Sequence, residues 1–134
     1  MLEYKPLKNK VLIVVDIYVS RKHLTMMLDH WNIEYDVALN GNQVIYLASI
    51  KQYAVILMDF QLPEVNGYQV TKWIKTKSRC NLDTPIVAIS LTVDDLEFDE
   101  SKREDFYVIL PTPCPAEFLF DLLCQLKFEI PIAY

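Results

Sequence analysis

The sequence predicts a three-layer α/β domain, in which helices cover both faces of a parallel sheet. Short apolar runs at 11–15, 54–58 and 86–89 each end at a polar residue, which is typical of strands buried on both faces. Segments with apolar residues at helical spacing separate and follow these runs. Strand–helix–strand crossovers imply parallel strands, and right-handed crossovers distribute the helices over both faces.

The first strand is expected at 10–16, an apolar run that ends on Asp16. Ser20 can cap the following helix by accepting a hydrogen bond from a free backbone N–H. The helix should end near residues 31 and 32. One apolar stripe runs along it, formed by Leu24, Met27, Leu28 and Trp31.

A shorter strand and a second helix are expected next. The strand falls within 33–39, and a turn at 40–42 leads into a helix that Asn42 caps. The inward face of this helix is formed by Val44, Ile45, Leu47 and Ala48.

The third strand, 54–58, stops abruptly at one carboxylate, Asp59. A proline and an Asn–Gly pair follow within eight residues, and the next helix places Val70, Trp73 and Ile74 inward. Because open α/β sheets bind ligands at the carboxyl ends of their strands, Asp59 is a candidate site residue by position alone.

The last two strands are expected at 86–90 and 106–110, after a polar loop at 78–85. Between them, seven of the twelve residues 94–105 are acidic, so a helix there should be short or loosely held. These acids are interpreted as a solvated face, with a docking surface for a basic partner as the alternative. Pro115 suits the first position of a last helix, whose stripe is Phe118, Leu119, Leu122, Leu123 and Leu126.

Composition narrows the classes of function. The 134 residues are 52% apolar, which suits one globular domain, and no apolar run approaches the ~20 residues that span a bilayer. A net charge of −5 argues against nucleic-acid binding by this domain. The cysteines (Cys80, Cys114 and Cys124) lack Cys-x-x-Cys spacing and suggest reduced thiols in the cytoplasm. His23 and His30 are interpreted as surface residues.

Three ranges divide the chain. Residues 1–9 are interpreted as a leader or linker, 10–128 as the domain, and 129–134 as a C-terminal tail. The chain has two glycines, so it offers no glycine-rich loop for a flavin or a nucleotide phosphate.

Several segments resemble the receiver domains of two-component phosphorelay systems. Residues 55–67, Val-Ile-Leu-Met-Asp-Phe-Gln-Leu-Pro-Glu-Val-Asn-Gly, are similar to the family's phosphoacceptor segment at almost every position. Residues 84–90 and 107–111 match two further family segments, and 19–22 look like receivers attached to hybrid sensor histidine kinases. The resemblance covers about 9–128. It implies a flavodoxin-like sandwich whose five-stranded parallel sheet has the order 2-1-3-4-5.

The resemblance also implies a site. Asp59 would be the phosphoacceptor, and Asp16, Asp59 and the backbone carbonyl of Gln61 would hold Mg²⁺. Ser90 would bind a phosphoryl oxygen and move on activation, and Tyr107 would swing inward with it.

Two positions depart from the family pattern. Val15 stands where the family has an acid, and Leu110 stands where it has a lysine. A cation about 4 Å from the phosphoryl group is worth on the order of 4 kcal/mol. Loss of an acid that orients metal-bound water typically costs ~10–100-fold in affinity or activity.

These departures favour a degenerate receiver, a pseudo-receiver that acts as a regulatory protein-interaction module. The alternative is a slow, Mg²⁺-dependent phosphoacceptor that takes a phosphoryl group on Asp59 from a histidine kinase. Expected partners are a histidine kinase or phosphotransfer protein, or other domains of the same protein, with no nucleic acid or membrane contact. The domain alone is not expected to be an enzyme, although it could be part of a hybrid histidine kinase.

Overall fold

Five strands form one parallel sheet of order β2-β1-β3-β4-β5, as the sequence predicts. The computed structural model describes residues 10–60, 62, 67–90, 104–126 and 128. The strands are β1 (Val11–Val14), β2 (Tyr35–Ala38), β3 (Val55–Asp59), β4 (Ile86–Ser90) and β5 (Val108–Pro111). The helices are α1 (Tyr18–His30), α2 (Gly41–Ile50), α3 (Gly67–Lys77) and α5 (Ala116–Gln125). Most of the predicted helix at 94–105 lies outside the described residues.

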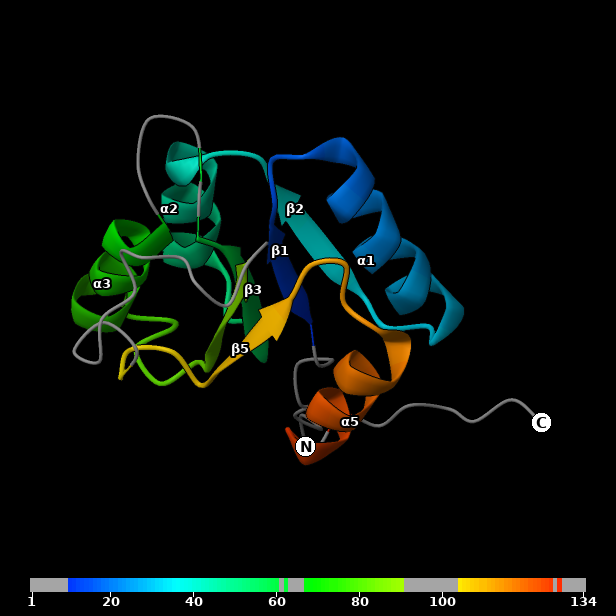
Figure 1. The fold of residues 1–134 in the computed structure, drawn as a ribbon. Coiled ribbons are helices and arrows are strands. Elements are labelled where there is room, and N and C mark those ends of the chain that lie inside the picture. Colours follow the sequence, from blue (N-terminus) through cyan, green and yellow to red (C-terminus); the bar gives the residue numbers. More distant parts are fainter. Residues whose placement is uncertain (1–9, 61, 63–66, 91–103, 127, 129–134) are drawn as a thin grey trace.

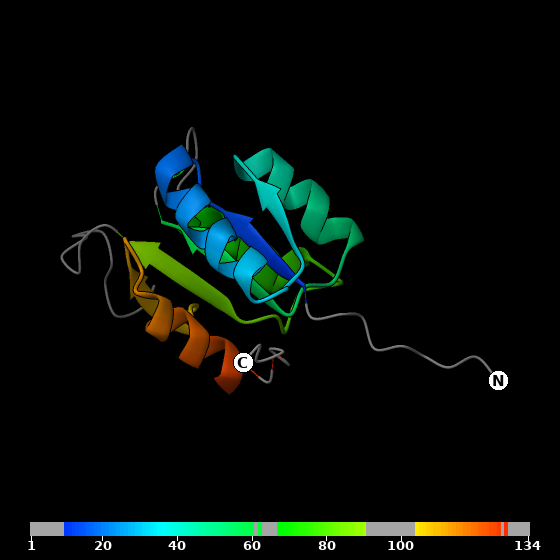
Figure 2. The same cartoon turned by 90° about the vertical axis from the view of Figure 1, so that its right-hand side faces the viewer.

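Helices cover the sheet in two pairs, with α2 and α3 on one face and α1 and α5 on the other (Figures 1 and 2). Successive residues of a strand point to opposite faces, so each strand contributes to two cores. Val11 and Ile13 pack in the α1/α5 core, and Leu12 and Val14 pack in the α2/α3 core. This double burial explains the continuous apolar runs.

Both predicted helix caps are wrong. The helix α1 begins at Tyr18 with Ile17 at the N-cap, so Ser20 lies inside its first turn. Asn40, not Asn42, caps α2, and its side-chain oxygen accepts a hydrogen bond from the Gln43 N–H at 2.9 Å. Asn40 has the extended backbone that an N-cap requires, whereas residue 42 is already helical.

The last helix also differs in part from its predicted stripe. Pro115 occupies the N-cap, one position before the first helical residue. Leu119, Leu122 and Leu123 are buried as predicted, but the side chain of Phe118 is 51% exposed. Its neighbour Phe120 instead packs edge-on against Trp31, with ring centroids 5.4 Å apart.

Gly67 brings the start of α3 against the end of β3. Its N–H donates a hydrogen bond to the Phe60 carbonyl oxygen at 2.7 Å. A Cβ at this position would overlap the Asp59 carbonyl oxygen and lie 3.1 Å from Met58 Cγ. Only glycine therefore fits without displacing the backbone around Asp59.

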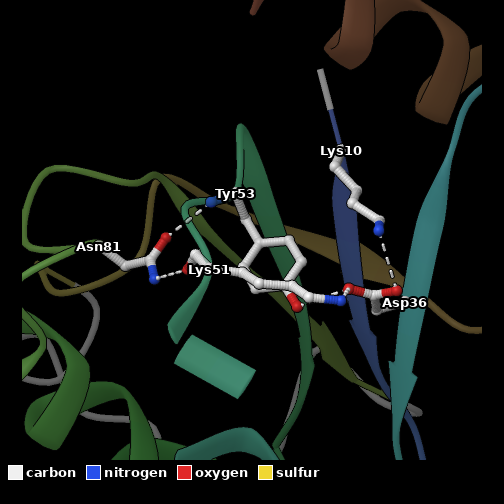
Figure 3. A network of polar contacts seen from close by, with 5 residues as sticks. All are labelled: Lys10, Asp36, Lys51, Tyr53 and Asn81. Carbon is white, nitrogen blue, oxygen red and sulfur yellow. Dashed lines mark hydrogen bonds and ion pairs between the residues drawn. The ribbon is translucent and has the colours of Figure 1, made fainter. Parts of the chain in front are cut away.

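A buried amide joins three segments at the amino edge of the sheet (Figure 3). The Asn81 side-chain oxygen accepts hydrogen bonds from Tyr53 N and Thr84 Oγ1, at 2.8 and 2.9 Å. Its Nδ2 donates to the carbonyl oxygens of Ala48 and Lys51, both at 2.8 Å. The loop predicted only as polar is therefore a structural junction between α2, β3 and β4.

Asp36 of β2 extends this network to Lys10, the first described residue (Figure 3). Its carboxylate accepts hydrogen bonds from the Tyr53 hydroxyl at 2.7 Å and Lys51 Nζ at 3.2 Å, and it pairs with Lys10 Nζ at 3.2 Å. Burial alone would raise the pKa of Asp36, but these three donors outweigh it and lower that pKa. Burial and the Asp36 carboxylate raise the pKa of Tyr53, so its hydroxyl remains a donor.

Within the described ranges, no helix combines the length and the apolar character that crossing a bilayer demands.

Replacement of Gly67 should destabilise the fold. Gly67→Ala forces the new methyl group against the Asp59 carbonyl, and overpacking of this kind costs about 1–3 kcal/mol. Urea unfolding measures the change, with Asn42→Ala, an exposed site on α2, as the control expected within about 0.5 kcal/mol of wild type. Equal stability of Gly67→Ala and the control would contradict the close approach.

Asp36 should make stability depend on acidic pH. Because its pKa is lowered in the folded state, its contribution is present above its ordinary value of 3.8 and is lost as pH falls through the folded pKa. We expect Asp36→Asn to cost about 1–2 kcal/mol near neutral pH and progressively less below that value. Urea unfolding across this range tests it, with exposed Asp83→Asn as the control, and a pH-independent difference would contradict it.

Candidate functional site

The candidate site lies at the carboxyl edge of the sheet, where β3 ends on Asp59. The Asp59 side chain is partly buried. In the strand register, Asp59 is opposite Ile89 of β4, and Ile89 is opposite Leu110 of β5. Residues opposite one another in parallel strands share a face, so these three side chains form one row on the α1/α5 side.

Both positions predicted to depart from the family pattern are buried: Leu110 lies in this row, and Val15 lies beside it. Val15 is 1% exposed and Leu110 is 7% exposed, and both belong to the α1/α5 core together with Ile89. Val14 pairs with Met58, so Val15 follows at the level of Asp59 on the neighbouring strand. Apolar side chains thus occupy the rest of the row beyond Asp59 and the position beside Asp59 that follows β1.

Asp16 follows two residues beyond the end of β1 and is exposed. Because β1 and β3 are adjacent, Asp16 and Asp59 sit at neighbouring strand ends. The Arg21 guanidinium holds the connecting turn, since its Nη1 donates to the carbonyl oxygens of Val15 at 3.2 Å and Asp16 at 2.9 Å. The same guanidinium lies 5.5 Å from the ring centre of Tyr18.

Sequence reasoning did not identify Arg21 as a site residue. The available signal was a long cationic side chain in the first turn of the helix that follows a strand end, where backbone carbonyls leave the sheet without strand partners. That pattern is weak without the turn geometry.

The structure says less about the remaining predicted site residues. Ser90 is the last residue of β4, with Pro111 opposite it. Tyr107 directly precedes β5, its N–H donates to the Ile86 carbonyl at 2.8 Å, and its side chain is 52% exposed. Gln61 lies outside the described residues.

The acids at this edge fit a magnesium ion. Among the described residues, no three His, Cys, Asp or Glu side chains are grouped as metal ligands. Mg²⁺ needs fewer, because it is often bound through one or two carboxylates and keeps several waters. Asp16 and Asp59 would supply the two carboxylates and leave the remaining positions to other oxygens.

A cavity of about 300 Å³ opens beside the site, between the start of α1 and the loop after β5. It is lined by Val19, Ser20, His23, Leu24, Ile89, Thr112, Pro113 and Cys114. The His23 side chain is exposed as predicted, but its Nε2 also lies 2.9 Å from the Cys114 carbonyl oxygen and bridges the two segments. All three cysteines are free, and burial raises the pKa of the Cys114 thiol, which suits a packing role.

Comparison with known proteins agrees with this arrangement. The sequence model of the response regulator receiver domain matches residues 11–123. The transcriptional regulatory protein SrrA of Staphylococcus aureus is 35% identical over 105 residues, which cover 76% of this chain and 42% of SrrA. The chain therefore spans less than half the length of this curated relative.

Solved receiver structures share the fold. A CheY-like receiver from Methylobacillus flagellatus superposes with a TM-score of 0.79 at 19% identity, covering 89% of this chain and 98% of that chain. The receiver domain of sensor histidine kinase PA1611 from Pseudomonas aeruginosa, solved with magnesium in its active-site cleft, gives 0.78 at 24% identity, covering 91% and 99%. The family match, the sheet order and the acids at its carboxyl edge lead to one conclusion: this chain belongs to the response regulator receiver domain family of two-component signalling.

Proposed function

We propose that this receiver domain is a regulatory protein-interaction module whose phosphoacceptor site is degenerate. The observation that carries the proposal is the burial of Val15 and Leu110 in the same core, at the level of the Asp59 row. A receiver with these two side chains lacks an acid and a cation where phosphoryl transfer needs charge.

The missing cation should have the larger effect. A phosphoryl group carries about −1.5 to −2 charges near neutral pH, and a lysine about 4 Å away contributes on the order of 4 kcal/mol at an effective dielectric constant near 20. Leu110 contributes none of this, and its apolar side chain is itself buried.

The same substitutions should stabilise the unphosphorylated fold. Clustered carboxylates repel one another, and a buried cation must have a partner. Val15 and Leu110 instead bury apolar surface in the same core as Ile89. The domain would therefore remain in one conformation, which suits constitutive binding.

The proposed partners are a histidine kinase, a phosphotransfer protein or other domains of the same protein, including those of a hybrid sensor kinase. Receiver domains as a class interact with kinases and phosphotransfer proteins, and one structural neighbour is the receiver of a sensor histidine kinase. We place the domain in the cytoplasm, where free thiols such as its three cysteines persist.

A slow phosphoacceptor is the second candidate, and the retention of both Asp16 and Asp59 at adjacent strand ends favours it. In this reaction an Asp59 carboxylate oxygen attacks the donor's phosphorus, and the bond to the donor's nitrogen or oxygen breaks. Asp16 and Asp59 would hold Mg²⁺, which neutralises charge on the transferred group when bound. Ser90 would donate its hydroxyl to a phosphoryl oxygen, and Tyr107 would follow its movement.

Phosphorylation of the wild-type domain should be slow. With acetyl phosphate and Mg²⁺, we expect the double variant Val15→Asp, Leu110→Lys to be labelled at least about tenfold faster than wild type, because it regains both charges. Intact-mass analysis measures the labelling. The control double variant Val15→Asp, Leu110→Met should be labelled no faster than Val15→Asp alone. Adding Asp59→Asn to the Val15→Asp, Leu110→Lys variant should abolish labelling. Rapid, stoichiometric labelling of the wild-type domain would refute the degenerate site.

Val15→Asp alone should link stability to magnesium. Placing a carboxylate at this buried position should cost about 2–4 kcal/mol without metal. Added Mg²⁺ should recover part of this loss, because ligands that bind the folded state stabilise it. Val15→Asn is the matched control: it should be destabilised without a comparable recovery. Identical Mg²⁺ responses in the two variants would contradict a metal site at this edge.

A further inference from the structure

Arg21, half-buried in the first turn of α1, contacts the backbone that leads from β1 toward the site. The strand β1 ends at Val14, and within the described residues the pairing with β2 and β3 stops there, before Val15 and Asp16. The Arg21 Nη1 donates to the carbonyl oxygens of both, at 3.2 and 2.9 Å. Hydrogen bonds from a charged donor are roughly twice as strong as neutral ones.

The guanidinium is itself held in position. It lies 5.5 Å from the centre of the Tyr18 ring, a distance at which a cation is attracted to the face of an aromatic ring. The α1 helix packs on the sheet through Leu24 and Leu28, which are buried in the α1/α5 core. One rigid donor therefore joins the helix to the two residues that connect it to the strand.

This contact bears on the direction of the Asp16 side chain. Asp16 is exposed, and its side chain leaves the turn in a direction that the backbone sets. Holding the carbonyls on both sides of the Asp16 α-carbon restricts that direction.

We propose that Arg21 is the positioning residue of the metal site, fixing the β1–α1 turn so that the Asp16 carboxylate faces the end of β3. The inference rests on the assignment of Asp16 and Asp59 as Mg²⁺ ligands. Arg21 itself does not touch the metal, because it is a cation. It acts through the backbone of Asp16.

Magnesium affinity separates this role from a simple charge effect. Arg21→Gln removes the charge and the two-carbonyl contact, whereas Arg21→Lys keeps the charge but replaces the planar fork with a point donor. If Arg21 positions Asp16, both variants should weaken Mg²⁺ binding by about tenfold, the usual scale for residues that orient metal ligands. If its charge merely repels Mg²⁺, Arg21→Gln should bind more tightly and Arg21→Lys should be unchanged.

The experiment is a Mg²⁺ titration followed by backbone amide chemical shifts, with hydrogen exchange of the 15–18 amides as a second measurement. Lys22→Gln removes a charge of the same sign from an exposed neighbour, and it should match wild type in both. Faster exchange at 15–18 together with weaker binding in both Arg21 variants, at unchanged thermal stability, would support the proposal.

Three results would overturn it. They are unchanged or tighter Mg²⁺ binding in Arg21→Gln, loss of folding in both Arg21 variants, and absence of Mg²⁺ binding by the wild type. The last would leave the interaction module standing. Rapid labelling of wild-type Asp59, measured separately, would instead refute the degenerate site without affecting the role of Arg21.

Discussion

A strand covered on both faces can present a charged side chain only where it ends. This constraint governs β1 and β3, whose residues Val11–Val14 and Val55–Met58 are fully buried between two helical layers. Asp59 is partly exposed because it is the last residue of β3, and Asp16 becomes exposed only after the chain has left β1. The position of the candidate site follows from the burial of the sheet.

The carboxylates at the two edges of the sheet have different surroundings. At the amino edge, Asp36 is hydrogen-bonded by Tyr53 and Lys51 and paired with Lys10, which lowers its pKa. At the carboxyl edge, the Asp59 row continues through Ile89 to Leu110, both apolar. Val15, Ile89 and Leu110 supply apolar packing at that edge as part of the α1/α5 core.

The sequence alone was sufficient for the sheet and its order, because continuous apolar runs and family-like segments are local signals. Local signals failed where backbone geometry decides: Asn40 caps α2 because its backbone is extended, and Phe118 faces solvent although it fits a helical stripe. The junction at Asn81 and the contact from Arg21 to the end of β1 depend on segments brought together by folding. At the site, the positions of Asp16, Asp59 and Leu110 followed from motif register, but the burial of Leu110 in the helical core required the structure.

Gly67 bears on how the acceptor segment should be interpreted. Its contact with the backbone of Asp59 and Phe60 is needed to join β3 to α3, whatever chemistry occurs nearby. Selection for folding alone would therefore keep this glycine, together with the buried run before it, in a lineage that had stopped transferring phosphate. Such a segment is reliable evidence of family membership. Activity is better judged from the charged residues that phosphoryl transfer needs, and at two of the positions where the resemblance expects them this domain has Val15 and Leu110.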